Sequence, residues 1–127
     1  MDDSTFNEVI VRWTILILAL SVLQAQVPAK SVNELRAFYA SHCVKCHGLD
    51  GSAHNAEGKP LAGLDFTDAN RMAKESDAMM AKTIRKGIFF GVVMHPFKNR
   101  LTEADAQLLV KEILRKAEKG KVIAPGQ

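Results

Sequence analysis

The chain has 127 residues, of which 47% are hydrophobic and 6% aromatic, and its formal net charge is +3. This length allows one domain with a modest core, or a smaller domain behind a leader segment. The basic residues are scattered and no basic cluster is interleaved with aromatic residues, which argues against a nucleic-acid partner. The lack of long charge runs and of internal repeats in the sequence argues against disorder and against a solenoid.

Residues 1–29 have the pattern of an export leader. An apolar run, Trp13 to Leu23, follows Arg12 and precedes small and polar residues. The run is shorter than the roughly 20 apolar residues of a spanning helix, so we expect a cleaved signal peptide and a periplasmic or otherwise exported protein, soluble after cleavage. Cleavage after Ala29 satisfies the small-residue rule best, with Ala25 as the alternative. An uncleaved leader would instead anchor the protein to a membrane.

The start of this leader is unusually acidic. Three acidic residues precede Arg12, whereas export leaders normally begin basic. We therefore expect translation to start later, at Val9 or Val11. Without residues 1–29 the chain keeps 16 basic and 11 acidic residues, a net charge of +5. This excess favours, weakly, partners with acidic docking surfaces.

A helix is predicted from Val32 into the two cysteines of the chain. Ser31 and Glu34 have the spacing of a capping box, and Val32, Leu35 and Tyr39 keep the three-four spacing of one helix face. We expect this helix to present the cysteine motif that follows it.

The motif Cys43-Val44-Lys45-Cys46-His47 contains the only two cysteines of the chain. C-x-x-C-H is typical of covalent haem attachment. Positions three apart share one face of a helical turn, so both thiols can reach one haem, and His47 then projects towards the iron. Zinc would need four ligands, and the remaining histidines have no paired spacing with the cysteines. The cysteines could also form a simple disulfide or a thioredoxin-like pair, but the latter needs an α/β pattern that is missing here.

The middle of the chain is predicted to be a long loop followed by a helix. Gly48 to about Lys74 is rich in Gly, Asp and Asn and contains Pro60. A loop of this length inside a small domain usually has a function, and wrapping the edge of a cofactor would be one. A helix is expected over Asp77 to Lys86, capped by Ser76 and ended by Gly87.

The apolar loop from Phe89 to Phe97 supplies the candidates for the sixth iron ligand. Met94 is the first candidate, because its thioether favours reduced iron. His95 is a rival that would give two histidine ligands. Three further methionines, Met72, Met79 and Met80, are better explained as core residues.

The last predicted helix opens at Thr102 with Asp105 and carries an apolar stripe. The stripe consists of Leu101, Ala104, Leu108, Ile113, Leu114 and Ala117. No segment alternates like a strand, so the sequence predicts an all-α domain of three to four helices.

Over residues 31–119 the chain resembles a small class I cytochrome c of the bacterial, cytochrome-c6-like kind. The resemblance rests on CVKCHG with Asp50-Gly51, on GKPLAGLDFT, and on MHPFKNRLTEADAQLLVKEI. It implies an all-α fold wrapped around one haem c, with thioether bonds from Cys43 and Cys46 and axial ligation by His47 and Met94. It also implies that a proline carbonyl, here that of Pro60, holds the other ring nitrogen of the axial histidine. The haem-pocket wall is expected from the apolar residues Leu61, Leu64, Phe66, Phe89 and Phe97.

These features predict a signal peptide over 1–29, a cytochrome domain over 30–120 and a tail over 121–127. With both axial positions filled, iron cannot bind a small-molecule substrate, so we expect a single-electron carrier between donor and acceptor proteins. One alternative is a haem enzyme or gas sensor with an open or displaceable sixth site, for which His95 and His54 are the candidate acid–base groups. A second is a cytochrome subunit of a larger oxidoreductase complex.

Overall fold

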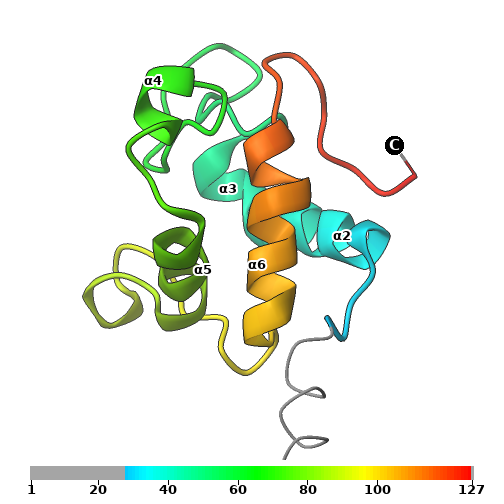
Figure 1. The fold of residues 1–127 in the computed structure, drawn as a ribbon. Coiled ribbons are helices and arrows are strands. Elements are labelled where there is room, and N and C mark those ends of the chain that lie inside the picture. The colour runs from blue at the N-terminus through cyan, green and yellow to red at the C-terminus, as the bar shows by residue number, and fades with distance from the viewer. Residues whose placement is uncertain (1–27, 127) are drawn as a thin grey trace, which may run out of the picture.

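The computed structural model describes residues 28–126, which form one helical domain (Figure 1). In chain order its elements are α2 (Val32–His42), α3 (Val44–His47), α4 (Ala69–Met72), α5 (Asp77–Lys86), η2 (Phe89–Gly91), α6 (Glu103–Glu112) and η3 (Leu114–Lys116). Within this part of the chain the only β pairings are two isolated bridges. The predicted all-α fold is confirmed. The predicted signal peptide lies almost wholly outside the described residues.

Helix α2 starts and ends at local signals in the sequence. The Ser31 hydroxyl accepts from the Glu34 N–H at 3.2 Å, and the Glu34 carboxylate accepts from the Ser31 N–H at 2.7 Å. The helix breaks at Cys43, and the short helix α3 carries the rest of the cysteine motif. The predicted helix into the motif is therefore correct, with a break at the first cysteine.

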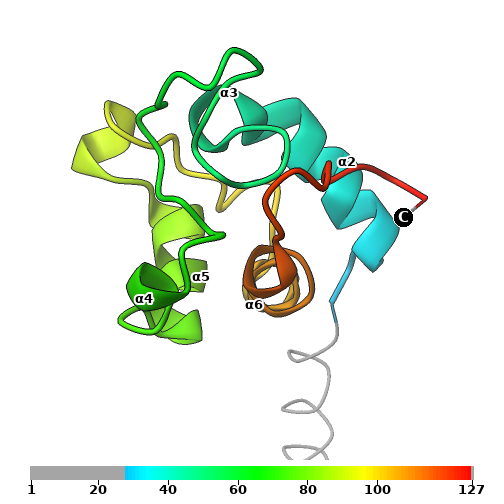
Figure 2. The same ribbon diagram turned by 90° about the horizontal axis from the view of Figure 1, so that it is seen from above.

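Helix α6 lies between α2 and α5, which flank it on opposite sides (Figure 2). Its buried face consists of Ala106, Leu109 and Val110. Of the predicted stripe, Leu101, Ile113 and Leu114 are buried, Leu108 and Ala117 are half-buried and pack against the core, and Ala104 is half-buried. The helix meets two neighbours on opposite sides, so more of its circumference is buried than one stripe covers.

The start of α6 is fastened by a buried carboxylate. The Asp105 side chain accepts hydrogen bonds from the Thr102 N–H at 2.9 Å and from the Lys30 N–H at 2.8 Å. Burial alone raises the pKa of Asp105, but the hydrogen bonds with Thr102 and from Lys30 outweigh it, so the pKa lies below its usual value. One side chain thus joins the first described residues to the last long helix.

The segment after η3 packs onto the domain. The Gly120 N–H donates to the Asp50 carboxylate at 2.7 Å, and the Ile123 N–H donates to the Leu49 carbonyl at 2.8 Å. Ile123 is buried in the core. Residues 121–126 are thus an integrated part of the fold.

The long loop that we predicted from Gly48 contains one helical turn, α4. Within residues 28–126 no helix is long and apolar enough to cross a membrane.

Candidate functional site

One cavity of about 430 Å³ gathers the sequence-predicted ligands. Cys43, Cys46 and His47 reach it from the motif, Leu64 from the long loop, and Met94 from the loop after α5. Other lining residues from these segments and from α5 and η3 include Ala62, Gly63, Phe66, Met80, Thr83, Ile84, Ile88, Val93, His95, Phe97 and Leu114. This volume and this mainly apolar lining with a few polar groups are typical of cofactor sites.

His47 is held in one orientation and, as a neutral ring, in one tautomer. Its Nδ1 lies 3.0 Å from the Leu64 carbonyl oxygen. Because a carbonyl can only accept, Nδ1 carries the proton and Nε2 is the nitrogen left to bind a metal ion. The Phe66 ring stacks on the imidazole, with ring centroids 4.5 Å apart. Burial lowers the pKa of His47, an effect that the hydrogen bond to Leu64 partly opposes. The neutral imidazole is the form that ligates iron.

The predicted hydrogen bond from His47 to the Pro60 carbonyl is wrong. Pro60 is exposed and pairs with His54 in an isolated bridge. The chain approaches the motif three residues later, where the Gly63 N–H donates to the Cys46 carbonyl at 2.8 Å. That bond brings the next carbonyl, of Leu64, to the imidazole. The sequence signal that we missed is Gly63, which has no side chain and so lets the backbone come this close to the cysteine motif.

The thiol of Cys43 does not have the low pKa of a reactive redox cysteine. Burial, followed by the neighbouring Cys46, raises the pKa of Cys43 to about 12. Such a thiol stays protonated, unlike the low-pKa thiolate of a thioredoxin-like pair. The two cysteines do not form a disulfide in the structure. No three His, Cys, Asp or Glu side chains in residues 28–126 lie close enough to hold a metal ion by themselves.

The cavity narrows the choice of a sixth ligand. Met94 is half-buried and lines the cavity, and the exposed His95 lines it as well. Met80 reaches it from α5. Met72 is buried away from the lining, and Met79 is exposed. Three of the five candidates, Met94, His95 and Met80, therefore reach the cavity.

The expected pocket wall is found only in part. Leu64, Phe66 and Phe97 line this cavity, whereas Leu61 lines a different one and Phe89 is 75% exposed. Several wall residues, among them Ile84 and Thr83 on α5, were not predicted. Apolarity identified the candidates, but the paths of the two long loops decide which of them face the cavity.

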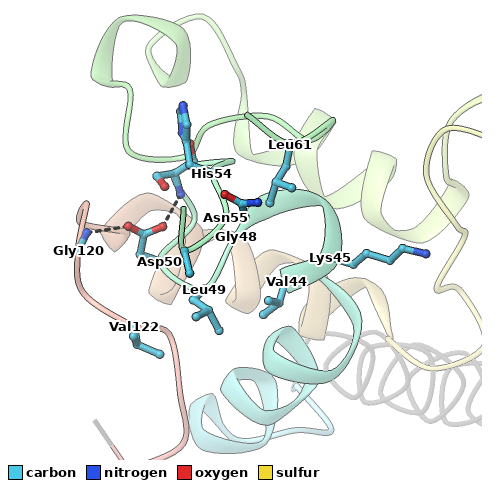
Figure 3. Close-up of a pocket in the computed structure, with 12 residues that line it drawn as sticks. Val44, Lys45, Gly48, Leu49, Asp50, His54, Asn55, Leu61, Gly120 and Val122 are labelled. Atoms are coloured by element: carbon cyan, nitrogen blue, oxygen red, sulfur yellow. Dashed lines mark hydrogen bonds between the residues drawn. The ribbon is translucent and has the colours of Figure 1, made fainter. Parts of the chain in front are cut away.

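A second cavity, of about 470 Å³, lies between the start of the long loop and the C-terminal segment (Figure 3). Its lining includes Leu49, Asp50, Leu61 and Val122 but neither cysteine nor His47. The Asp50 carboxylate is occupied by the backbone N–H groups of Gly120 and Ser52. A haem attached through the motif therefore fits the first cavity, where both thiols and the imidazole meet apolar walls.

Comparisons with known proteins agree with this geometry. Residues 30–111 match the family model described as cytochrome c oxidase, cbb3-type, subunit III. Two solved structures, one named KustC0563 c-type cytochrome and the other a mutant of that cytochrome, are 32% and 31% identical, with TM-scores of 0.51 and 0.53. Each alignment covers 66% of this chain and 96% or 98% of the other. No protein with a curated description matches the sequence. The chain thus belongs to the cbb3-type subunit III family of c-type cytochromes, with a helical fold and covalently attached haem c.

Proposed function

We propose that the protein is a single-electron carrier whose haem is bound by Cys43 and Cys46 and ligated by His47 and Met94. Haem c supplies an iron atom that gains one electron from a donor protein and returns it to an acceptor. The chain contributes two thioether bonds, an oriented imidazole and an apolar enclosure. If His47 and Met94 both held the iron, no position would remain for a substrate, and the chemistry would be limited to electron transfer.

The observation that carries this proposal is the convergence on one cavity of the two cysteines and the two candidate iron ligands. The motif provides three of them, and Met94 comes from a segment almost 50 residues away in the sequence. The Leu64 carbonyl holds Nδ1 of His47 and leaves Nε2 for the iron, and this kind of bond also makes the ligand more basic. Met94 is favoured over Met80 because Met80 is buried on α5, where an unbranched side chain fills the core.

The optical spectrum of the haem-loaded protein tests the ligation. Ferric haem with a methionine ligand has a weak far-red sulfur-to-iron band, which we expect in the native protein and not in the Met94→Ala variant. Two control variants, Met80→Leu and His95→Ala, are expected to keep the band. A native protein without the band, whose ferrous form binds carbon monoxide readily, would overturn the proposal and favour an enzyme or sensor with His95 beside an open site.

A second candidate function is an electron-transfer subunit of a larger oxidoreductase. The family description, which names a subunit of an oxidase, favours it. Size-exclusion chromatography of the holoprotein purified from its native cells distinguishes the two. A free carrier elutes at the size of a single mature chain, and a subunit elutes with its complex.

We further propose that the protein is exported. The apolar run from Trp13 to Leu23 and the small residues that follow it support this proposal. Sequencing the N-terminus of the mature protein tests it. A terminus at Lys30, or at Gln26 for cleavage after Ala25, is expected, whereas retention of the leader in the mature protein contradicts cleavage.

A further inference from the structure

The segment Ile88 to Val93, here called the apolar loop, exposes an unusual amount of hydrophobic surface. Its five non-glycine residues are between 39% and 105% exposed, and Phe90 is the most exposed of them. In both ribbon views the loop, yellow-green, projects from the side of the domain (Figures 1 and 2). Contiguous apolar surface that projects into water usually marks a site of interaction.

The apolar loop is held in a strained conformation. The Ile88 N–H donates to the Met94 carbonyl at 3.0 Å, and the Gly91 N–H donates to the Ile88 carbonyl at 3.1 Å. Phe89 and Phe90 have φ values of +49° and +52°, in the left-handed region that costs a residue with a Cβ conformational free energy. Asparagine or glycine would adopt these angles more easily. Strain kept at a surface position is typical of binding sites.

The loop stands at the edge of the haem cavity. Ile88 and Val93 line that cavity, and Met94 directly follows the loop. A partner that covers the loop is thereby brought next to the cofactor, where the distance for electron transfer is short.

The surroundings of the loop are basic. Between Asp77 and Glu103 the sequence has five basic residues and no acidic one. The Lys98 N–H donates to the Arg85 carbonyl at 3.0 Å, which places Lys98 beside the last turn of α5 and near Lys86. Lys82, Lys86 and Lys98 are exposed and form no ion pair within residues 28–126.

We propose that the apolar loop is the docking element for a redox partner protein that presents an apolar depression with an acidic rim. This inference rests on the proposed electron-carrier function. Charge argues against a second copy of the chain as the occupant, because it would bring two basic rims together. A lipid surface on the loop would cover the edge of the cavity through which electrons pass. Small, transient interfaces are typical of electron-transfer encounters, and basic rims speed them.

A gold electrode serves as a partner surface of defined composition. It carries a monolayer of carboxylate-terminated and methyl-terminated thiols, and cyclic voltammetry measures the rate of electron exchange with the holoprotein. In the double variant Phe89→Asn/Phe90→Asn the exposed rings are removed and the left-handed angles remain accessible, so the fold is retained. We expect its exchange rate at the mixed monolayer to fall by at least about tenfold, the loss typical of removing aromatic anchors.

Three further measurements make the result specific. Val122→Asn alters an exposed apolar residue that does not line the haem cavity, and this variant is expected to exchange electrons at the native rate. Lys86→Gln/Lys98→Gln is expected to reduce the dependence of the rate on salt. The sulfur-to-iron band of the double Phe variant is expected to be unchanged, which separates failure of docking from failure of the proposed ligation.

An unchanged exchange rate in the double Phe variant overturns the proposal. It is equally overturned if that variant keeps its rate but loses binding to vesicles of phosphatidylcholine and phosphatidylglycerol, because the occupant is then a membrane. A native dimer that the same substitutions convert to a monomer, seen by analytical ultracentrifugation, identifies a second copy instead.

Discussion

Gly63 gives a direct test of how the chain positions His47. The residue lies against the motif, and its N–H donates to the Cys46 carbonyl. A Cβ at this position would lie 2.5 Å from Nδ1 and 2.8 Å from Cε1 of His47, and would also overlap the Cys46 carbonyl oxygen. The Gly63→Ala substitution therefore forces the 63–64 segment and the imidazole apart.

The size of the effect follows from these distances. Ordinary contacts of a Cβ begin near 3.4 Å, so the methyl group requires a shift of about 1 Å. The hydrogen bond from His47 Nδ1 to the Leu64 carbonyl, now 3.0 Å, does not survive such a shift. Overpacking costs about 1–3 kcal/mol and the lost hydrogen bond about 1 kcal/mol, so the free energy of unfolding is expected to fall by about 2–4 kcal/mol. For a domain of this size Tm falls by at least about 10 °C.

The assay is denaturant unfolding of the holoprotein, combined with its reduction potential. Loss of the hydrogen bond to Leu64 makes the His47 imidazole a weaker electron donor to the iron, so the reduction potential is expected to rise. Gly58→Ala is the matched control, because nothing lies within 4 Å of its Cβ and only its φ of +77° opposes the change. This control is expected to cost about 1–2 kcal/mol and leave the potential unchanged. If both variants show the same stability and the same potential, the reasoning about Gly63 is refuted.

Three further predictions concern the core. The buried Tyr39 hydroxyl donates to the Gly48 carbonyl at 2.8 Å, so Tyr39→Phe is expected to cost about 1–2 kcal/mol in chemical denaturation with no spectral change; equal stability would contradict this. The pKa of Asp105 is lowered by folding, so its stabilisation is present above the unfolded pKa near 4 and is lost as pH falls through the folded value. Asp105→Asn is accordingly expected to lower Tm at pH 7 and to make less difference at pH 2–3, and a constant difference across this range would be the contrary result. A haem-free Cys43→Ala/Cys46→Ala variant keeps an unfilled cavity of about 430 Å³ and is not expected to unfold cooperatively by calorimetry; a sharp transition would show that the apo-fold is stable.

The helices could be predicted from the sequence because their signals are local. Both capping boxes, at Ser31 and Thr102, lie where the sequence predicts them, and α5 has its predicted bounds. The cysteine motif is likewise a local signal, and its two cysteines and His47 line one cavity, as their spacing predicts. Each of these signals acts over a few residues, so neighbouring side chains are sufficient to decide it.

The contacts across loops could not be predicted, because they depend on where distant segments meet. Leu64 replaces Pro60 as the partner of His47 since the close approach happens at Gly63. Phe89 is as apolar as the residues that line the haem cavity, but its side chain is exposed to solvent. The left-handed backbone of Phe89 and Phe90 turns the loop outwards after Ile88. Hydrophobicity alone does not separate a pocket wall from a docking surface.

The fastening of the C-terminal segment brings the two ends of the described chain together. The Gly126 N–H donates to the Asn33 side chain at 2.6 Å, only five residues from the first described position. A short linker can therefore join residues 28 and 126 without disturbing α2 or the haem cavity, since neither end lines that cavity. The domain has the geometry of an insertable module: it can be placed within a loop of another redox protein, or cut and rejoined as a circular permutant, and still enclose its cofactor.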